Sequence, residues 1–174
     1  GTCTFQQLPD RALLLRWPGK QEGDPAVMMA HYDVVPVNEE KWDKPPFAGV
    51  IEDGILWGRG TLDTKCTLCC ALEAAEQLLS EGFTPEHDLY FAFSGEEEIA
   101  GDSASDIADE LQRRGVVPAF VLDEGGAVVT GVFPGVDAPC ALVGTSEKGQ
   151  MQLFLDMKSE GGHASAPPRS TIAG

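Results

Sequence analysis

The stretch "AVMMAHYD", residues 26–33, decides how the rest of the chain is interpreted. Its apolar run predicts a strand that ends in His31 and, after one intervening residue, Asp33. Side chains alternate along a strand, so these two project from the same face, where an imidazole and a carboxylate can support each other. Two interpretations are open: a buried histidine paired with a local acid, or a metal ligand with its acid partner.

Similar apolar segments recur along the chain and alternate with helical patterns. Short apolar runs predict strands, and apolar residues at helical spacing followed by glycine predict helices. Strands are expected at residues 11–17, 26–33, 54–60, 88–94 and 119–126, and helices at 64–80 and 103–115. The runs at 88–94 and 119–126 are typical of strands buried on both faces. This order predicts an α/β fold, a three-layer sandwich with a largely parallel sheet.

A change in the pattern of polar and apolar residues near Val143 predicts a domain boundary. Beyond it, the stretch "MQLFLDMKSEGG" at residues 151–162 alternates polar and apolar residues like a half-exposed strand. We therefore expect residues 1–142 to form the first domain and residues 143–174 to begin a second one.

Composition narrows the class of function. The chain has 174 residues, 43% of them hydrophobic, which suffices for a real core, and a formal net charge of -16. That charge argues against nucleic acid, because no surface rich in lysine and arginine is available to neutralise phosphates. No run approaches the roughly 18–20 apolar residues of a membrane span, and no polybasic patch is present. We expect neither nucleic acid nor a membrane as a partner.

The cysteines indicate a reducing compartment. Five of them, an odd number, are too few for a disulfide-rich scaffold, so reduced thiols in a cytoplasmic protein are the simplest account. Cys66, Cys69 and Cys70 fall within the apolar run at residues 64–80, which predicts small, buried core residues. The alternative for this Cys-x-x-Cys-Cys sequence is a metal-binding or redox motif.

Acidic residues and a histidine collect where the predicted strands end, which is where open α/β sheets place their binding sites. The four strand ends carry His31 and Asp33, then Asp63, then Glu96 to Glu98, and finally Asp123 with Glu124. Carboxylates that converge in one crevice repel each other unless cations bridge them. A histidine among carboxylates suits zinc, with manganese or cobalt as alternatives. The pattern therefore predicts a metal site.

Five motifs give the chain a resemblance to a known family. "HYDVVP", "GRGTLDTK", "SGEEEIAG", "LDEGG" and "GGHASAPP" occur in the order and approximate spacing of the M20 metallopeptidases, and residues 146–170 look most like the carboxypeptidase S branch. The resemblance implies a zinc-exopeptidase-like fold with two Zn²⁺ ions, replaceable by Mn²⁺ or Co²⁺. It implies cleavage of an amide bond next to a free carboxylate. It also implies that residues 143–174 begin an α+β lid domain through which the protein forms a homodimer.

The same resemblance assigns the metal ligands. His31 would bind one metal together with Asp63 and Asp123, and Asp33 would orient the histidine. Asp63 would also bridge to the second metal, whose further ligand on this chain would be Glu98. By resemblance, the peptide bond after Asp63 is expected to be cis.

The run "GEEEIAG" assigns the catalytic residues through its register. The family has an acid pair followed by an aliphatic residue and then a nearby glycine, so the resemblance selects Glu97 as the general base and Glu98 as the metal ligand. Glu96 is then a flanking acid. In "GGHASAPP", the resemblance makes His163 the lid residue that reaches the substrate of the partner subunit and donates to the developing oxyanion.

The resemblance also sets an expectation about length. In the family, the second metal takes its last ligand from a histidine after the lid, whereas this sequence ends at Gly174, within the lid. We expect the front part of a longer enzyme that acts on a small peptide or an N-acyl amino acid. By itself, the chain should bind at most one zinc ion well, associate through an exposed sheet edge and lack turnover. The alternative is a non-catalytic relative that serves as a metal-binding or dimerising module.

Overall fold

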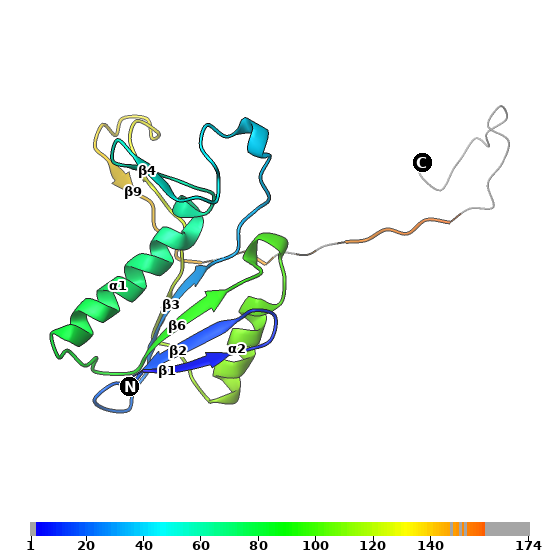
Figure 1. Cartoon of the computed structure of the whole chain (residues 1–174). Coiled ribbons are helices and arrows are strands. Elements are labelled where there is room, and N and C mark those ends of the chain that lie inside the picture. Colours follow the sequence, from blue (N-terminus) through cyan, green and yellow to red (C-terminus); the bar gives the residue numbers. More distant parts are fainter. Residues whose placement is uncertain (1–2, 147, 150, 152, 159–174) are drawn as a thin grey trace. The chain divides into compact units, whose positions relative to one another are not determined.

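A mixed five-stranded sheet organises the computed structural model (Figure 1). Across the sheet the strands lie in the order β1 (Thr4–Gln7), β2 (Leu13–Trp17), β6 (Leu89–Ser94), β3 (Ala26–His31) and β7 (Phe120–Leu122). Strand β3 runs parallel to β6 and to β7, whereas β2 is antiparallel to both β1 and β6. The structure describes residues 3–146, 148–149, 151 and 153–158.

The expected largely parallel sheet is thus corrected to a mixed sheet with a parallel centre. The antiparallel part begins with the hairpin of β1 and β2, whose tight connection is closed by hydrogen bonds from the Leu8 N–H to the Ala12 carbonyl, 2.8 Å, and from the Ala12 N–H to the Pro9 carbonyl, 2.9 Å. A connection this short joins only antiparallel neighbours, because a parallel pair needs a long crossover. Strand β1 was not expected from the sequence, since "TFQQ" is short and mostly polar.

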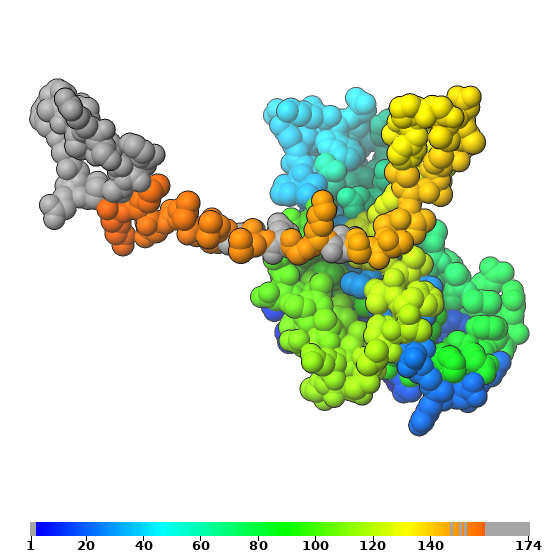
Figure 2. Space-filling view, turned by 180° about the vertical axis from the view of Figure 1, so that it is seen from behind, coloured from blue at the N-terminus to red at the C-terminus, as the bar shows by residue number. Residues whose placement is uncertain are grey.

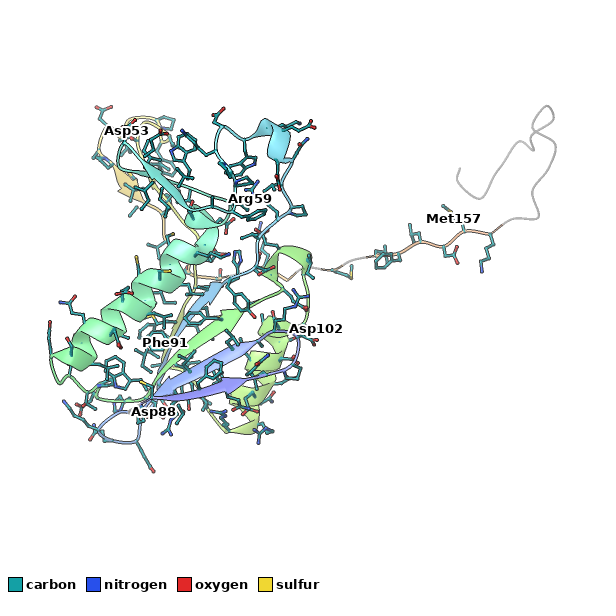
Figure 3. The ribbon with its side chains drawn as sticks, viewed as in Figure 1. Asp53, Arg59, Asp88, Phe91, Asp102 and Met157 are labelled. Atoms are coloured by element: carbon teal, nitrogen blue, oxygen red, sulfur yellow. The ribbon has the colours of Figure 1, made fainter. Side chains whose placement is uncertain are left out.

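Two helices cover opposite faces of the sheet and complete three layers (Figure 1). Strand β6 is apolar throughout because both of its faces are covered. On one face, helix α1 (Cys66–Ser80) packs on a cluster formed by Trp17, Ala30, Ala75, Phe91 and Phe93, in which Phe91 lies between β6 and α1 (Figure 3). On the other face, helix α2 (Ser103–Arg113) packs on the cluster Ala12, Leu14, Val27, Tyr90, Ala92, Ile107 and Leu111.

Strand β7 is exposed rather than buried, contrary to the expectation for residues 119–126. Phe120, Val121 and Leu122 each retain about half of their accessible surface. The reason is topological: β7 pairs with β3 on one side, and within the described residues no strand pairs with its other side. The residues around β7, yellow-green in Figure 2, accordingly lie at the surface.

The three cysteines of α1 are also exposed, which corrects the expectation of buried core residues. The stripe of α1 that packs toward the sheet contains Leu68, Ala71, Ala75 and Leu79, spaced three or four residues apart. Positions 66, 69 and 70 lie outside this stripe. The helix is apolar as predicted, but the cysteines lie on its exposed side and not on the side that packs against the sheet.

Small elements connect and follow this layered core. Strands β4 (Val50–Glu52) and β5 (Ile55–Trp57) form an antiparallel ribbon, and the short helical turns are η1 (Glu39–Lys41), η2 (Thr61–Lys65) and η3 (Glu97–Ile99). No helix among the described residues combines the length and the hydropathy needed to cross a bilayer.

The chain divides into two compact units, residues 1–125 and 126–174. In the second unit, β8 (Val128–Val129) pairs with β9 (Cys140–Ala141). The described residues between 151 and 158 are exposed and carry no strand, so the strand expected at 151–162 is not seen there. The domain boundary at residue 143 and the α+β lid stay predictions.

Candidate metal centre

His31 lies at the carboxyl end of β3, the position expected for a binding site in a sheet with parallel strands. Its side chain is 2% exposed, so only its ring edge is available. The ring nitrogen Nε2 is 2.9 Å from Oδ1 of Asp63 and 3.3 Å from Oε1 of Glu124. These side chains come from the strand β3, the turn η2 and the segment after β7, so the fold brings together groups that are far apart in sequence.

Asp33 holds both the histidine and the acidic turn η3. Nδ1 of His31 is 3.1 Å from the Asp33 carbonyl oxygen and 3.3 Å from Oδ1 of its carboxylate. The same carboxylate accepts hydrogen bonds from the backbone N–H groups of Glu97, 3.2 Å, and Glu98, 3.0 Å. A metal-binding histidine commonly uses its second nitrogen in this way, which fixes the ring and leaves Nε2 for the ion. The contacts of Asp33 are compatible with an orienting role, which stays a prediction.

The structure brings both Glu97 and Glu98 to the histidine. Ligand atoms of His31, Glu97 and Glu98 lie within 4.8 Å of one another. Oε2 of Glu97 is 3.9 Å from Nε2 of His31, and its side chain is 53% exposed. Their division into general base and metal ligand stays a prediction, because both carboxylates reach the same place. Glu96 differs from them, since it pairs with the Arg11 guanidinium at 3.4 Å.

At the end of β7, the second of two adjacent acids reaches the histidine. His31, Asp63 and Glu124 form a second group of ligand atoms within 4.8 Å of one another. Asp123, the ligand expected from the family resemblance, is exposed, and its Oδ1 accepts the Glu124 N–H at 2.8 Å. Both acids lie beyond the end of β7, where the chain bends, and of the two only the Glu124 carboxylate approaches His31. Glu124 is therefore a candidate that the sequence reasoning noted at the strand end but did not assign.

Asp63 is presented by the irregular turn η2 between β5 and α1. Its backbone is non-helical, with φ -114° and ψ 99°, and a cis peptide bond joins it to Thr64, as expected from the resemblance. Gly60, at the start of η2, has φ +81°, and a Cβ at this position would collide with the side chain of Val34. Lys65 closes the turn by donating to the Tyr32 carbonyl at 2.6 Å. The turn is thus tied to the segment that follows His31.

The electrostatics of the cluster favour a cation. Burial alone would lower the pKa of His31, but the hydrogen bond with Asp63 and the charges of Glu124 and Glu97 raise it above its ordinary value. Burial raises the pKa of Glu124, with Asp63 adding to the effect and His31 partly offsetting it. The shift of His31 reflects the carboxylates around its imidazole, whereas that of Glu124 reflects mainly burial. One nitrogen and several carboxylate oxygens form a donor set that fits zinc, and also manganese or cobalt.

His163, the lid histidine expected from the sequence, lies outside the residues that the structure describes. All the other predicted site residues fall in the first compact unit. His31, Asp33, Asp63, Glu97 and Glu98 are brought together, and Asp123 lies beside the group.

A buried histidine ringed by carboxylates at the carboxyl ends of parallel strands is an arrangement typical of metal-dependent hydrolases of the α/β class. Comparison with known sequences specifies the family. Residues 27–169 match the family described as Peptidase family M20/M25/M40, and the chain belongs to this family.

Its relatives include an N-fatty-acyl-amino acid synthase/hydrolase and carboxypeptidases. The chain is 44% identical over 150 residues to human N-fatty-acyl-amino acid synthase/hydrolase PM20D1, a match covering 86% of this chain and 30% of the relative. It is 40% identical to probable carboxypeptidase S-like 2 of Dictyostelium discoideum, covering 94% and 32%, and 34% identical to carboxypeptidase S of Saccharomyces cerevisiae, covering 98% and 31%. The chain thus spans about a third of the length of these relatives.

Solved structures share the fold. Human carnosine dipeptidase 1 matches with a TM-score of 0.64 at 16% identity, covering 74% of this chain and 30% of that protein. The M20 family metallo-carboxypeptidase Sso-CP2 from Sulfolobus solfataricus matches with a TM-score of 0.59 at 24% identity, covering 72% and 29%. These matches support the mixed sheet with a parallel centre and flanking helices.

Proposed function

We propose that the protein containing this chain is a dinuclear metal-dependent hydrolase that cleaves an amide bond next to a free carboxylate. The observation that carries the proposal is the pair of overlapping donor groups around His31, one with Asp63 and Glu124, the other with Glu97 and Glu98. A single structural ion needs only one such group. The second group adds two further carboxylates, so that one of them can contribute to a second ion while the other stays free to act as a base.

The residues divide between the two ions as follows. His31 and Asp63, with one of the acids after β7, would hold the first ion, and Asp63 with Glu98 would contribute to the second. When bound, such a pair of ions lowers the pKa of a shared water and polarises the scissile carbonyl. Asp63 suits the bridging role because its side chain is 67% exposed, in contrast to the buried His31 that it contacts at 2.9 Å.

Glu97 is proposed as the general base. It would accept a proton from the attacking water and deliver it to the leaving amine. Its half-exposed carboxylate lies near the ligand cluster, and Asp33 holds its backbone. His163, on the lid of a partner subunit in a homodimer, would donate to the oxyanion.

The substrate class that we propose is an N-acyl amino acid or a small peptide with a free carboxylate. The names of the relatives support both, since they include an N-fatty-acyl-amino acid synthase/hydrolase and carboxypeptidases. The test is hydrolysis by the full-length protein of paired substrates that carry the same C-terminal amino acid, one acylated by a fatty acid and one by an amino acid. Hydrolysis of neither by the metal-loaded protein would contradict the proposal.

For the 174 residues by themselves, we propose metal binding without turnover. In the described residues, the group with Asp63 and Glu124 contains the buried His31 and can supply three ligands to one ion, while water completes a four-coordinate site. Titration of the purified chain with zinc should give one tight equivalent, and an assay of acyl-amino-acid cleavage should give no rate. Two tight equivalents, or turnover that is lost in Glu97→Gln, would show that these residues form a complete active site.

A further inference from the structure

Three exposed cysteines stand at the start of α1, and the proposed reaction uses none of them. Cys66 is the first residue of the helix, and Cys69 and Cys70 follow one turn later. Residues three and four positions apart lie on the same side of a helix, so Cys66 neighbours both of the others. The structure therefore leaves a group of accessible thiols beside a candidate metal centre rather than three buried core residues.

The helix geometry permits a link between two of these thiols. In an α-helix, Cα atoms three residues apart are separated by about 5 Å, and those four residues apart by about 6.2 Å. Both Cα separations fall within the range of about 4.4–6.8 Å found in disulfides. The Cβ atoms, about 5–6 Å apart on a regular helix, must approach to about 3.5–4.5 Å, so the link requires a local adjustment of the helix. Cys66 and Cys69 together line one hollow of about 410 Å³, and Cys66 and Cys70 together line another of about 520 Å³. Cys66 is therefore the common member of both pairs.

The end of the helix favours the first pair. Cys66 and Cys69 span only the first turn, in which the backbone N–H groups of residues 66–68 have no partners within the helix. Lys65, at the N-cap, makes no side-chain capping bond, and the residues before it have non-helical backbone angles. This turn can adjust to a cross-link more readily than the second turn, to which Cys70 belongs, because hydrogen bonds within the helix hold the second turn.

We propose that Cys66 and Cys69 are a redox-active dithiol that a peroxide oxidises to a disulfide within α1. One thiol is oxidised by hydrogen peroxide to a sulfenic acid, with release of one water. The other thiol then attacks that sulfur, forming the S–S bond and releasing a second water. Two electrons pass from the sulfurs to the peroxide in total. A dithiol reductant reverses the reaction by thiol–disulfide exchange.

The dithiol is connected to the metal centre by one hydrogen bond. Sγ of Cys66 donates to the Leu62 carbonyl at 3.0 Å, and Leu62 directly precedes Asp63. A disulfide has no S–H group, so oxidation removes this bond from the turn that presents Asp63. We expect weaker metal binding in the oxidised chain. This consequence rests on the proposed metal site, whereas the cross-link itself does not.

Mapping the cross-link tests the dithiol directly. Tryptic peptide 66–113 contains Cys66, Cys69 and Cys70 but neither Cys3 nor Cys140, because no lysine or arginine lies inside it. After treatment of the 174-residue chain with hydrogen peroxide, mass spectrometry should show this peptide lighter by two hydrogens. The Cys70→Ser variant should keep the loss, and Cys66→Ser and Cys69→Ser should abolish it. A loss that persists in Cys69→Ser, or an unlinked peptide when Cys3 is already oxidised, would overturn the proposal.

Metal affinity tests the connection to Asp63. Mn²⁺ is the probe, because thiolates prefer softer ions. Oxidation should weaken Mn²⁺ binding by about tenfold in the wild-type chain, and the matched variant Cys66→Ser should resist oxidation while its hydroxyl keeps the bond to Leu62. Cys66→Ala should bind weakly without oxidant. Equal affinity of the mapped oxidised and reduced forms would refute the connection. Absence of Mn²⁺ binding in the reduced chain would instead refute the proposed function.

Discussion

Acidic residues at the two ends of the central sheet have pKa values shifted in opposite directions. At the amino end of β6, Asp88 accepts a hydrogen bond from the Arg16 guanidinium at 2.5 Å and from the Gly19 N–H at 2.9 Å (Figure 3). Burial alone would raise the pKa of Asp88, but these bonds hold it below its ordinary value. At the carboxyl end of β3, the pKa of Glu124 is raised, and the basic partner nearest to it among the described residues is His31.

The difference separates a structural acid from a ligand. A carboxylate with a lowered pKa is already paired with a positively charged side chain of the protein, so it needs no further cation. Carboxylates that share one imidazole lack sufficient positive charge, which a divalent ion would supply. The following substitutions test this distinction, from the largest expected effect to the smallest.

The largest effect is expected for Glu97→Gln in the full-length protein. Amide replaces carboxylate without changing the size of the side chain, so the metals should stay bound while the base is lost. We expect kcat to fall by roughly 10² to 10⁴ or more. The measurement is kcat together with metal content.

Glu98→Ala is the paired variant, which should instead lose metal. If Glu97→Gln lost metal and Glu98→Ala kept it, the register chosen within "GEEEIAG" would be wrong.

Substitutions of the two adjacent acids after β7 should differ in how strongly they weaken metal binding. If the side chain nearest to His31 is the ligand, Glu124→Gln should weaken Mn²⁺ binding by more than the roughly 10–100-fold typical of outer partners. Asp123→Asn should then weaken it by less. Calorimetric titration of both variants decides between them, and the opposite order would restore Asp123 as the ligand expected from the family resemblance.

Asp33→Asn should have an intermediate effect, because Asp33 acts through other residues. The amide retains one oxygen for the N–H groups of η3 but carries no charge to support the histidine. We expect metal affinity to fall by roughly 10–100-fold with the fold intact. Circular dichroism checks the fold, and unchanged affinity would show that the Asp33 carbonyl alone orients the ring.

The smallest effect is expected at the opposite end of the sheet. Asp88→Asn should lower the free energy of unfolding by about 1 kcal/mol at pH 7, because Arg16 is partly exposed and water screens the pair. The folded-state pKa of Asp88 is lowered, so its contribution is present above the unfolded value near 3.8 and disappears as the pH falls through the folded value. Urea titrations of both proteins at several pH values measure the difference.

Glu86→Gln is the matched control for that substitution. Glu86 lies close to Asp88 in sequence and pairs with Lys20 at 3.9 Å, but both of these side chains are exposed. A change within about 0.5 kcal/mol is expected. Metal binding should be unaffected by either substitution, and a loss of metal affinity in Asp88→Asn would contradict the contrast between the two ends.

Features set by local pattern could be predicted from the sequence. Strands β3 and β6 follow from continuous apolar runs, and α1 follows from its periodicity, with ends within two residues of those expected. The meeting of His31 with Glu97 and Glu124 follows from the rule that parallel strands bring their carboxyl ends to one edge. Asp63 reaches His31 by another route, because β5 belongs to a separate antiparallel ribbon and the turn η2 carries Asp63 to the sheet edge.

Features set by neighbours could not be predicted in this way. The exposure of β7 depends on what pairs with its second edge, which no property of "FVL" determines. The exposure of Cys69 depends on which stripe of α1 meets the sheet. Whether Asp123 or Glu124 faces His31 depends on the direction of one residue after a strand has ended, where the regular alternation no longer applies.

The strand order has a consequence for how the chain is made. Strand β6 lies between β2 and β3, although both precede it in sequence. A ribosome adds about 5–20 residues per second, so several seconds pass between the synthesis of β3 and that of β6, the strand that joins β2 to β3. During that interval their apolar edges have no native partner, a situation that chaperones exist to manage. His31 is synthesised before Glu97 and Glu124, so the two groups of ligand atoms are complete only after β6 and β7 have docked, and ion capture is expected to follow that docking rather than to guide it.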